Sequence, residues 1–364
     1  MRKVAQIWST IQARLVPYLE EHLDEPLTEK QKQLVAVLEV VRVEEHVPPG
    51  SFQWMGRKRL DRRAIARAFV AKAVYDLATT ELLLDMLRNQ QNLRRICGWE
   101  RRSQVPSAAT FSRAFAEFAT SKLCDRVHEA LVREHVSERL VGHICRDSTE
   151  ITARERPVKK PPAPPKPKRR PGRPKKGEEV GQQRKTRLPQ QVEQSAEEAI
   201  AELPKVCDIG TKTSSKGHAH HWIGYKAHLD VNDAGLPISV VTTSASLHDS
   251  QVAIPLEKLT AQRVTSLYSV MDAAYDADLI KQVCRNLNHV PIIDSNARTV
   301  GKVPFDPATA QRYKVRTTVE RAYSRLKDEF GARHVRVRSH CKVHAHLMFG
   351  VLALFGDQLL KLVT

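Results

Sequence analysis

The sequence predicts a mixed α/β protein preceded by an all-helical region, and three observations support this fold class. Apolar residues recur at three- and four-residue spacing up to about residue 135, a period typical of helices. From Trp222 onward, runs that alternate apolar and polar residues predict strands, with helical stretches between them. A segment rich in proline and basic residues separates the two patterns. We therefore expect a mixed sheet with flanking helices in the second half of the chain.

The charge of the chain indicates its partner. Among 364 residues, 59 Lys plus Arg stand against 41 Asp plus Glu, so the formal net charge is +18. Such a surplus attracts polyanions, and nucleic acid is the expected partner because neutralised phosphates release counterions. An anionic membrane is the rival partner, but it needs an anchor. We expect none, since the N-terminus is too polar for a signal segment and the apolar run 347–355 is shorter than the roughly 20 residues of a membrane span.

That apolar run is predicted to be a buried core helix. The six cysteines are scattered and form no Cys-x-x-Cys pair, which argues against zinc-ribbon and redox sites. Scattered thiols suit a reducing compartment, so we expect a cytoplasmic protein.

The N-terminal region, residues 1–135, is predicted to be a set of short helices. Ser107 follows Pro106 and is a suitable N-cap for a helix that carries Phe111, Phe115 and Phe118. Arginines occur among these helices, from Arg59 to Arg102, which favours a DNA reader of the helix-turn-helix kind. An ordinary helical bundle with a solvated basic surface is the alternative, and helical sequence alone does not separate the two.

Residues 154–204 are predicted to form a disordered, basic, proline-rich arm. Between Arg154 and Gln190 there are 14 Lys and Arg against three Glu, and too few apolar residues to form a core. Within it, the stretch 170–176 resembles an AT-hook, in which Arg170, Arg173 and Lys175 would lie in an A·T-rich minor groove. The alternative is a basic linker that binds phosphates without preference.

The second half of the chain alternates strands and helices. Residues 136–153 hold a first strand that ends in Asp147, and residues 205–364 hold the remainder of the domain. In the latter we predict a hairpin with a turn at Asn232–Gly235, two further strands, two short helices and one long helix. These elements cover residues 223–231, 236–243, 250–262, 267–271, 277–286, 290–293 and 316–330.

Three carboxylates stand out by their positions. Asp147 follows the strand-like run 140–146, Asp272 follows the strand-like run 267–271, and Glu320 lies in the long helix. Carboxylates gathered from neighbouring strands and a nearby helix are suited to hard divalent cations. Without metal they repel one another.

The long helix also carries a polar row. Tyr313, Arg316, Glu320 and Lys327 are spaced by three, four and seven residues, which places them on one helical face. Arg316 and Lys327 would bind phosphates beside a metal held by Glu320. A solvated face stabilised by an Arg316–Glu320 pair is the alternative.

This spacing, Tyr-x2-Arg-x3-Glu-x6-Lys, resembles the signature of one group of DDE-type insertion-sequence transposases. The run 271–276 around Asp272 and the run 146–149 around Asp147 resemble the same family, as do 226–229 and 246–250. The N-terminal helices resemble the helical segment that precedes its catalytic domain. The likeness covers nearly the whole chain except the basic arm.

The resemblance implies an RNase H-like fold in which Asp147, Asp272 and Glu320 are catalytic and hold two Mg²⁺ ions, with Mn²⁺ as a substitute. It implies cleavage and strand transfer at the ends of an insertion sequence, with DNA contacts by Tyr313, Arg316 and Lys327. The resemblance implies double-stranded DNA as the partner, both the element's terminal inverted repeats and the target, and a homodimer on that DNA. It also implies a bacterial protein associated with the nucleoid. A repurposed, non-catalytic DNA-binding protein and a simple RNase H-like nuclease are the alternatives.

Other acids lie close to the candidates in sequence. Glu150 and Asp276 follow Asp147 and Asp272 by three and four residues, and we expect both to support the site from outside or to lie at the surface. Asp249 is expected to cap the helix that begins near Ser250.

Overall fold

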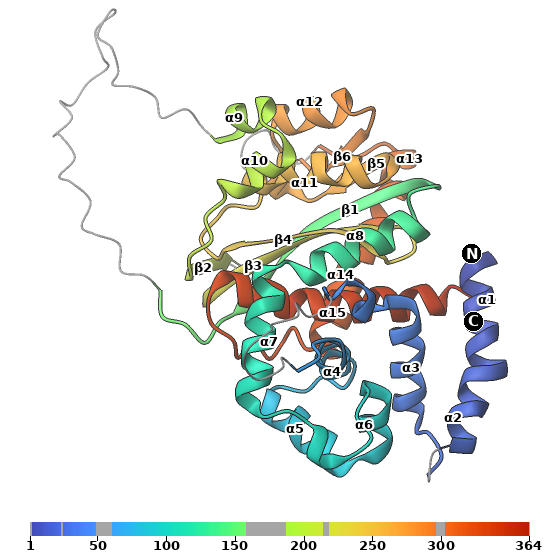
Figure 1. The fold of residues 1–364 in the computed structure, drawn as a ribbon. Helices are drawn as coiled ribbons and strands as arrows, with labels where there is room; N and C mark the ends of the chain where they lie inside the picture. The colour runs from blue at the N-terminus through green and yellow to red at the C-terminus, as the bar shows by residue number, and fades with distance from the viewer. Residues whose placement is uncertain are drawn as a thin grey trace, which may run out of the picture.

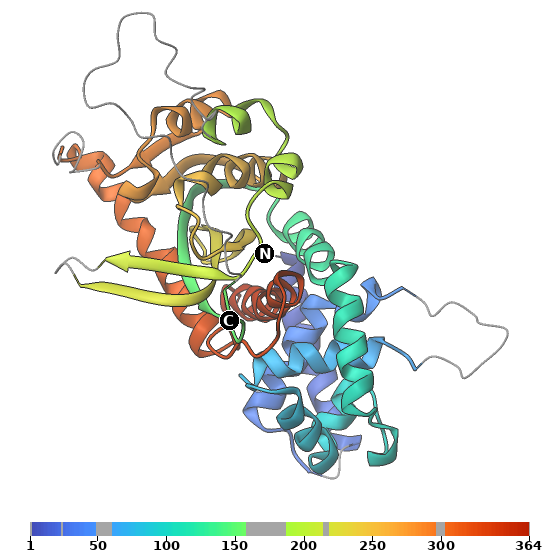
Figure 2. The ribbon, with the colours of Figure 1, turned by 90° about the vertical axis from the view of Figure 1, so that its left-hand side faces the viewer.

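The computed structural model describes residues 2–22, 25–48, 60–157, 187–213, 218–295 and 303–363. A six-stranded mixed sheet has helices on both faces, and a set of N-terminal helices lies beside it (Figures 1 and 2). The mixed α/β prediction is confirmed, and this sheet with its flanking helices is consistent with an RNase H-like domain.

The described part of the first 135 residues consists of helices joined by loops and turns, with no strand, as the periodicity predicts. Ser107 is the N-cap of α7, and its hydroxyl accepts a hydrogen bond from the Thr110 backbone N–H (3.4 Å). The helices of this region are α1 (Arg2–Thr10), α2 (Val16–His22), α3 (Glu29–Val41), α4 (Arg63–Val74), α5 (Thr80–Asn89), α6 (Gln91–Cys97), α7 (Ala108–Thr120) and α8 (Leu123–His135).

The sheet is built around one long strand, β1 (Leu140–Thr152). It pairs in parallel with β5 and antiparallel with β3, and the order across the sheet is β2-β3-β1-β5-β6, with β4 also paired to β3. The other strands are β2 (Asp208–Thr213), β3 (Ala219–Asn232), β4 (Pro237–Ser244), β5 (Thr265–Met271) and β6 (Val290–Ile293).

Two details of the sheet differ from the sequence-based prediction. Asp147 does not end its strand, because antiparallel pairing with β3 extends β1 to Thr152, opposite Gly224. Strand β2 was not predicted at all, since Asp208–Thr213 has no strong alternation, and it forms by pairing with the outer half of β3. The predicted hairpin turn is present, because Asn232 accepts bonds from Ala234 and Leu236 through its side chain.

Helices cover both faces of the sheet (Figure 1). On one face lie α11 (Ser250–Arg263) and α12 (Asp278–Asn286), and on the other lie α14 (Thr317–Asp328) and α15 (His340–Lys361). The helix α13 (Pro307–Tyr313) and a turn of 3-10 helix, Lys314–Arg316, lead into α14. The long helix predicted for 316–330 is therefore α14, with a tighter first turn.

The prediction of a disordered arm over 154–204 is wrong at both of its ends. Residues 154–157 are described, and residues 187–201 form α9 (Arg187–Glu193) and α10 (Ala196–Ala201). Leu188 and Val192 pack with α11 and α12, and Ile200 packs against the cluster around Leu256. Apolar residues at helical spacing bury this end of the arm, whereas residues 158–186, with the AT-hook-like stretch, lie outside the described residues.

The C-terminal helix α15 joins the helical region to the sheet. Residues 347–355 are buried, as predicted, between α3, α4, α7 and α8 on one side and β4 and α14 on the other. Of the helices described, α15 alone is long and apolar enough to cross a membrane, but 83% of its apolar window is buried inside the protein. One hydrophobic core therefore runs from α1 to α15.

Candidate active site

Strand pairing brings the two candidate aspartates side by side. Cys145 of β1 is opposite Val270 of β5 in the parallel register, and each aspartate lies two residues further along its chain. Side chains alternate between the faces of a sheet, so Asp147 and Asp272 point to the same face as Cys145 and Val270. The thiol of Cys145 donates to the Val315 carbonyl (3.3 Å), which identifies this face as the one covered by the 3-10 turn and α14.

The guanidinium of Arg316 joins all three candidate carboxylates. Its Nη2 atom lies 2.7 Å from Asp147 Oδ2 and 3.8 Å from Asp272 Oδ2. Its Nη1 atom donates to Glu320 Oε1 (2.7 Å), one helical turn further along. The 3-10 turn places Arg316 at the start of α14, beside Asp147 in the middle of β1 and Asp272 just after β5. Three acids that are far apart in the sequence thus converge on one cation.

Backbone N–H groups fix the outer oxygens of the two aspartates. Asp147 Oδ1 accepts from the Ser148 N–H (2.7 Å), and Asp272 Oδ1 accepts from the Ala274 N–H (2.9 Å) in the turn that follows β5. Burial raises the pKa of Asp147 to about 6, with Arg316 opposing the shift and Asp272 adding to it. Burial also raises the pKa of Asp272. Both groups therefore lie where a bound cation stabilises their charged forms.

Tyr313 and Lys327, the other two residues of the predicted polar row, lie in different helices. Tyr313 lies in α13, half-buried against Phe305 (ring centroids 5.0 Å apart), and burial raises its pKa to about 12 while Arg316 opposes the shift. Lys327 lies two turns beyond Glu320 on α14, where burial lowers its pKa and Glu150 opposes the shift. The acids and Arg316 are thus brought together with Tyr313 beside them, and Lys327 lies further along the helix.

Tyr323 connects α14 to both central strands, a role that the sequence did not reveal. Its hydroxyl lies 2.7 Å from the Asp147 carbonyl and 2.9 Å from the Ala227 carbonyl, and it accepts from the Leu229 N–H (2.9 Å). The sequence assigned Tyr323 only to the apolar face of the helix, where it is indeed buried. Because the phenol bonds the backbone of Asp147 itself, it fixes the distance between Glu320 and that aspartate.

A buried ionic network supports β1 from the opposite face. Arg146 donates through Nε and Nη2 to Asp230 (2.7 and 2.6 Å), and its Nη2 lies 2.8 Å from Glu257. Burial lowers the pKa of Arg146, but Asp230 and Glu257 outweigh it and the net shift is upward. The sequence placed Arg146 only in the run before Asp147. Its partners lie 84 and more residues away, so no local signal identifies them.

The other acids near the candidates have partners of their own. Asp249 precedes α11, but its side chain makes no capping bond, contrary to our expectation, and instead accepts from Lys226 (2.9 Å). Glu150 lies 3.2 Å from His220. Asp276 lies 2.5 Å from Lys281. Asp147, Asp272 and Glu320 are thus the three acids that share Arg316.

The donor set fits a hard divalent cation. Carboxylate oxygens from β1, from the end of β5 and from α14 all contact the guanidinium of Arg316, which occupies the position between them. Among the described residues, no three His, Cys, Asp or Glu side chains are close enough to hold a metal as they stand. A metal would therefore take the place of Arg316 among oxygen donors of the kind that Mg²⁺ and Mn²⁺ prefer.

Arg170, Arg173 and Lys175 lie outside the described residues. Lys212 of β2 was not predicted as part of the site. It contributes a positive charge to the surroundings of both Asp147 and Asp272, since it lowers the pKa of each. Nothing in the sequence could have placed Lys212 there, because β2 itself was not predicted.

Comparison with known protein families agrees with this geometry. A family model described as "Transposase DDE domain" matches residues 142–355, more than half of the chain and the part that holds all three acids. A second, described as "Transposase domain (DUF772)", matches residues 21–117 in the helical region. No curated protein and no solved structure gives a significant match. The chain therefore belongs to the DDE transposases, metal-dependent enzymes that cut DNA during transposition.

Proposed function

We propose that Asp147, Asp272 and Glu320 are the metal-binding, catalytic carboxylates of this transposase. We also propose that the chain belongs to the group with the Tyr-x2-Arg-x3-Glu-x6-Lys signature, which the residues Tyr313, Arg316, Glu320 and Lys327 match. The observation that carries the proposal is the convergence of the three carboxylates on the single guanidinium of Arg316.

The chemistry is strand cleavage and strand transfer at the ends of an insertion sequence. Two Mg²⁺ ions, or Mn²⁺ in their place, would supply activation of the attacking oxygen and stabilisation of the leaving oxygen. With a metal held by Asp147, Asp272 and Glu320, the guanidinium of Arg316 would hold a DNA phosphate beside them. Its planar guanidinium suits bidentate phosphate binding. Tyr313 contacts the same DNA from α13, and Lys327 binds a phosphate further along α14.

Transposition also requires DNA contacts outside the catalytic site and the pairing of two DNA ends. We propose that the helical region, residues 1–135, binds the terminal inverted repeats. The stretch with Arg170, Arg173 and Lys175 would contact a minor groove. Two ends must be paired before they are cut, so we propose a homodimer on DNA. We propose that the substrate is double-stranded DNA, both the element's terminal inverted repeats and the target, and that the protein acts on it in the bacterial cytoplasm, at the nucleoid.

The test is a strand-transfer assay with purified protein, a plasmid that carries the element's own ends and a target plasmid. Asp147→Asn, Asp272→Asn and Glu320→Gln should each lower joining by more than about 100-fold, since loss of one group that stabilises the transition state costs at least that much. Binding of the end DNA should persist. Removing divalent cations with a chelator should stop joining by the wild type, and Mn²⁺ should restore it.

Glu329→Gln is the matched control, since Glu329 follows α14 and pairs with Arg325 (2.9 Å) away from the acids. It should join DNA as the wild type does. Full joining by any one of the three acid variants would remove that residue from the site. Cleavage without joining by the wild type would indicate a simple nuclease, and tight end binding without cleavage would indicate a repurposed DNA-binding protein.

A further inference from the structure

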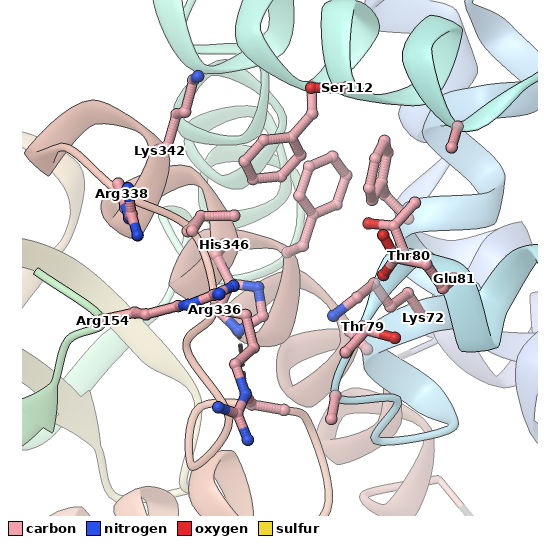
Figure 3. A pocket seen from close by; sticks show the side chains of 18 of the residues that line it. Lys72, Thr79, Thr80, Glu81, Ser112, Arg154, Arg336, Arg338, Lys342 and His346 are labelled. Carbon is pink, nitrogen blue, oxygen red and sulfur yellow. Dashed lines mark hydrogen bonds between the residues drawn. The ribbon is translucent and has the colours of Figure 1, made fainter.

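A cavity of about 590 Å³ lies where the N-terminal helices meet the loop between α14 and α15. Its wall on the catalytic side carries Arg154, Arg336, Arg338 and Lys342, and its wall on the helical side carries Lys72 and Glu81 (Figure 3). The cavity is separate from the three carboxylates described above, none of which lines it.

The cavity has an unbalanced positive charge. Five cationic side chains line it and Glu81 is its one acid. Within the described parts of the chain, no carboxylate forms an ion pair with Arg154, Arg336, Arg338 or Lys342. The three arginines are exposed to solvent. Unpaired guanidinium groups that line one cavity are the usual donors for phosphate and carboxylate ligands.

The fold holds these arginines together in spite of their mutual repulsion. Glu155, next to Arg154, accepts from the Ser339 backbone N–H (2.7 Å), next to Arg338, and from the Tyr225 hydroxyl (2.9 Å). The end of β1 is thereby tied to the loop that precedes α15. Both hydrogen bonds of the Glu155 carboxylate come from uncharged donors, the Ser339 N–H and the Tyr225 hydroxyl. Glu155 therefore holds the neighbours Arg154 and Arg338 close to each other but forms an ion pair with neither of them.

Lys72 lies on the helical wall of the cavity and is buried. Its side chain is 8% exposed, and its ammonium group donates to the Leu77 carbonyl (2.6 Å). Burial lowers the pKa of Lys72 to about 8, although Asp76 and Glu81 oppose the shift. In Figure 3 the Lys72 nitrogen points into the cavity, opposite the arginines. A bound anion would face cations from two walls.

We propose that this cavity binds phosphodiester groups of the DNA end and couples the helical region to the catalytic domain. The proposal rests on the proposed function. Arg154 lies seven residues after Asp147 along β1 and its extension, a span of at most about 23 Å, which about seven base pairs of duplex cover. The chain beyond Arg154 adds further Lys and Arg. A polymeric anion can contact the cavity and the three carboxylates at once, which an isolated anion cannot do.

The experiment measures DNA binding in EDTA, so that its result does not depend on catalysis. The probe is a 40-base-pair duplex with the element's own end, and the variant carries Arg154→Gln, Arg336→Gln and Arg338→Gln. The slope of log Kobs against log salt should become shallower by about 2 to 3, because each lost phosphate contact contributes about 0.9. A control with Arg139→Gln, Arg285→Gln and Lys361→Gln removes the same charge from exposed positions outside the cavity and outside residues 1–135, and it should keep the wild-type slope.

Three outcomes would overturn the proposal. The first is an unchanged slope in the cavity variant, and the second is an equal change in the control. The third is calorimetric binding of pyrophosphate that the variant loses while duplex binding stays intact, since the cavity would then hold a free anion. If the triple variant unfolds, each single variant should still lower the slope by about 0.9. Failure of the acid variants to stop joining would instead count against the proposed function alone.

Discussion

At the scale of single residues, two side chains organise the site from α14. Arg316 places one positive charge among the three carboxylates and so reduces the repulsion between them. The sequence suggested phosphate binding for Arg316, and the structure shows that it contacts these three carboxylates. Tyr323 contributes no charge. It bonds the backbone of β1 and β3 and so determines where Glu320 lies relative to Asp147.

Tyr323→Phe tests this positioning role. The change removes one hydroxyl and leaves the Leu229 N–H and the Asp147 carbonyl without that partner, so it should lower the free energy of unfolding by about 1–3 kcal/mol. Strand joining should fall more than end binding does, because the acids shift and the DNA contacts remain. Urea unfolding and the joining assay measure the two effects. Tyr18→Phe, at a residue that is 55% exposed, is the control. A variant with wild-type joining would show that the hydroxyl does not position Asp147.

At the scale of elements, the position of α14 depends on how closely α15 approaches it. A Cβ atom added at Gly350 would lie 2.5 Å from the Phe330 carbonyl oxygen and 3.0 Å from Leu326 Cδ1. Both contacts belong to α14 or to the turn after it. Glycine at this position therefore permits the two helices to pack closely, and α14 carries Glu320.

Gly350→Ala should destabilise the protein by about 1–3 kcal/mol through overpacking, less the roughly 1 kcal/mol that alanine gains within a helix. Gly356→Ala on the same helix is the matched control. Its added Cβ would lie 3.2 Å from a methyl group of Val41, which can shift slightly, so the helical gain should nearly balance the contact. The urea concentration at the unfolding midpoint should be lower for Gly350→Ala than for Gly356→Ala. Equal midpoints would rule out the close packing at Gly350.

At the scale of the whole molecule, the helical region and the catalytic sheet share one core. Apolar residues from α1 to α15 form a single cluster, and α15 lies inside it. Burial also leaves several histidines uncharged: it lowers the pKa of His128 to about 3 and the pKa values of His228 and His346 to about 4 each. In the unfolded chain a histidine takes up its proton near the ordinary value of 6.5. Between about pH 4 and pH 6.5, the unfolded state therefore binds more protons than the folded state does.

Stability should therefore fall as the pH decreases from about 6.5 toward 4, and it should be regained as the pH rises through the same window. Each such histidine contributes a slope of up to about 1.4 kcal/mol per pH unit. His128→Gln removes one of them, away from the acids, at a position that bonds the Pro237 carbonyl (2.9 Å). Unfolding free energies at several pH values should show a shallower slope for this variant than for the control His248→Gln at the surface. If the plots of unfolding free energy against pH were parallel for the two variants, His128 would not be a buried, uncharged histidine that contributes to the slope.

The elements themselves were largely predictable. Helices up to residue 135, the hairpin around Asn232–Gly235 and the helix that carries Glu320 all follow from periodicity and turn chemistry, which are local properties. The errors also have physical causes. β1 is longer than predicted because β3 pairs with it, and α9 and α10 fold because α11 and α12 bury their apolar residues. Such partners are supplied by distant parts of the chain.

The sequence by itself determined which acids, cations and phenol are available and which element carries each one, because spacing along a strand or helix fixes the face on which a side chain lies. Only the tertiary structure decided how they meet. Arg316 contacts Asp147 across 169 residues of chain, and Tyr323 bonds the carbonyl of the same aspartate across 176. The basic cavity likewise exists only where β1, the loop before α15 and the N-terminal helices come together. Contacts at such separations depend on the packing of the whole core, which periodicity does not encode.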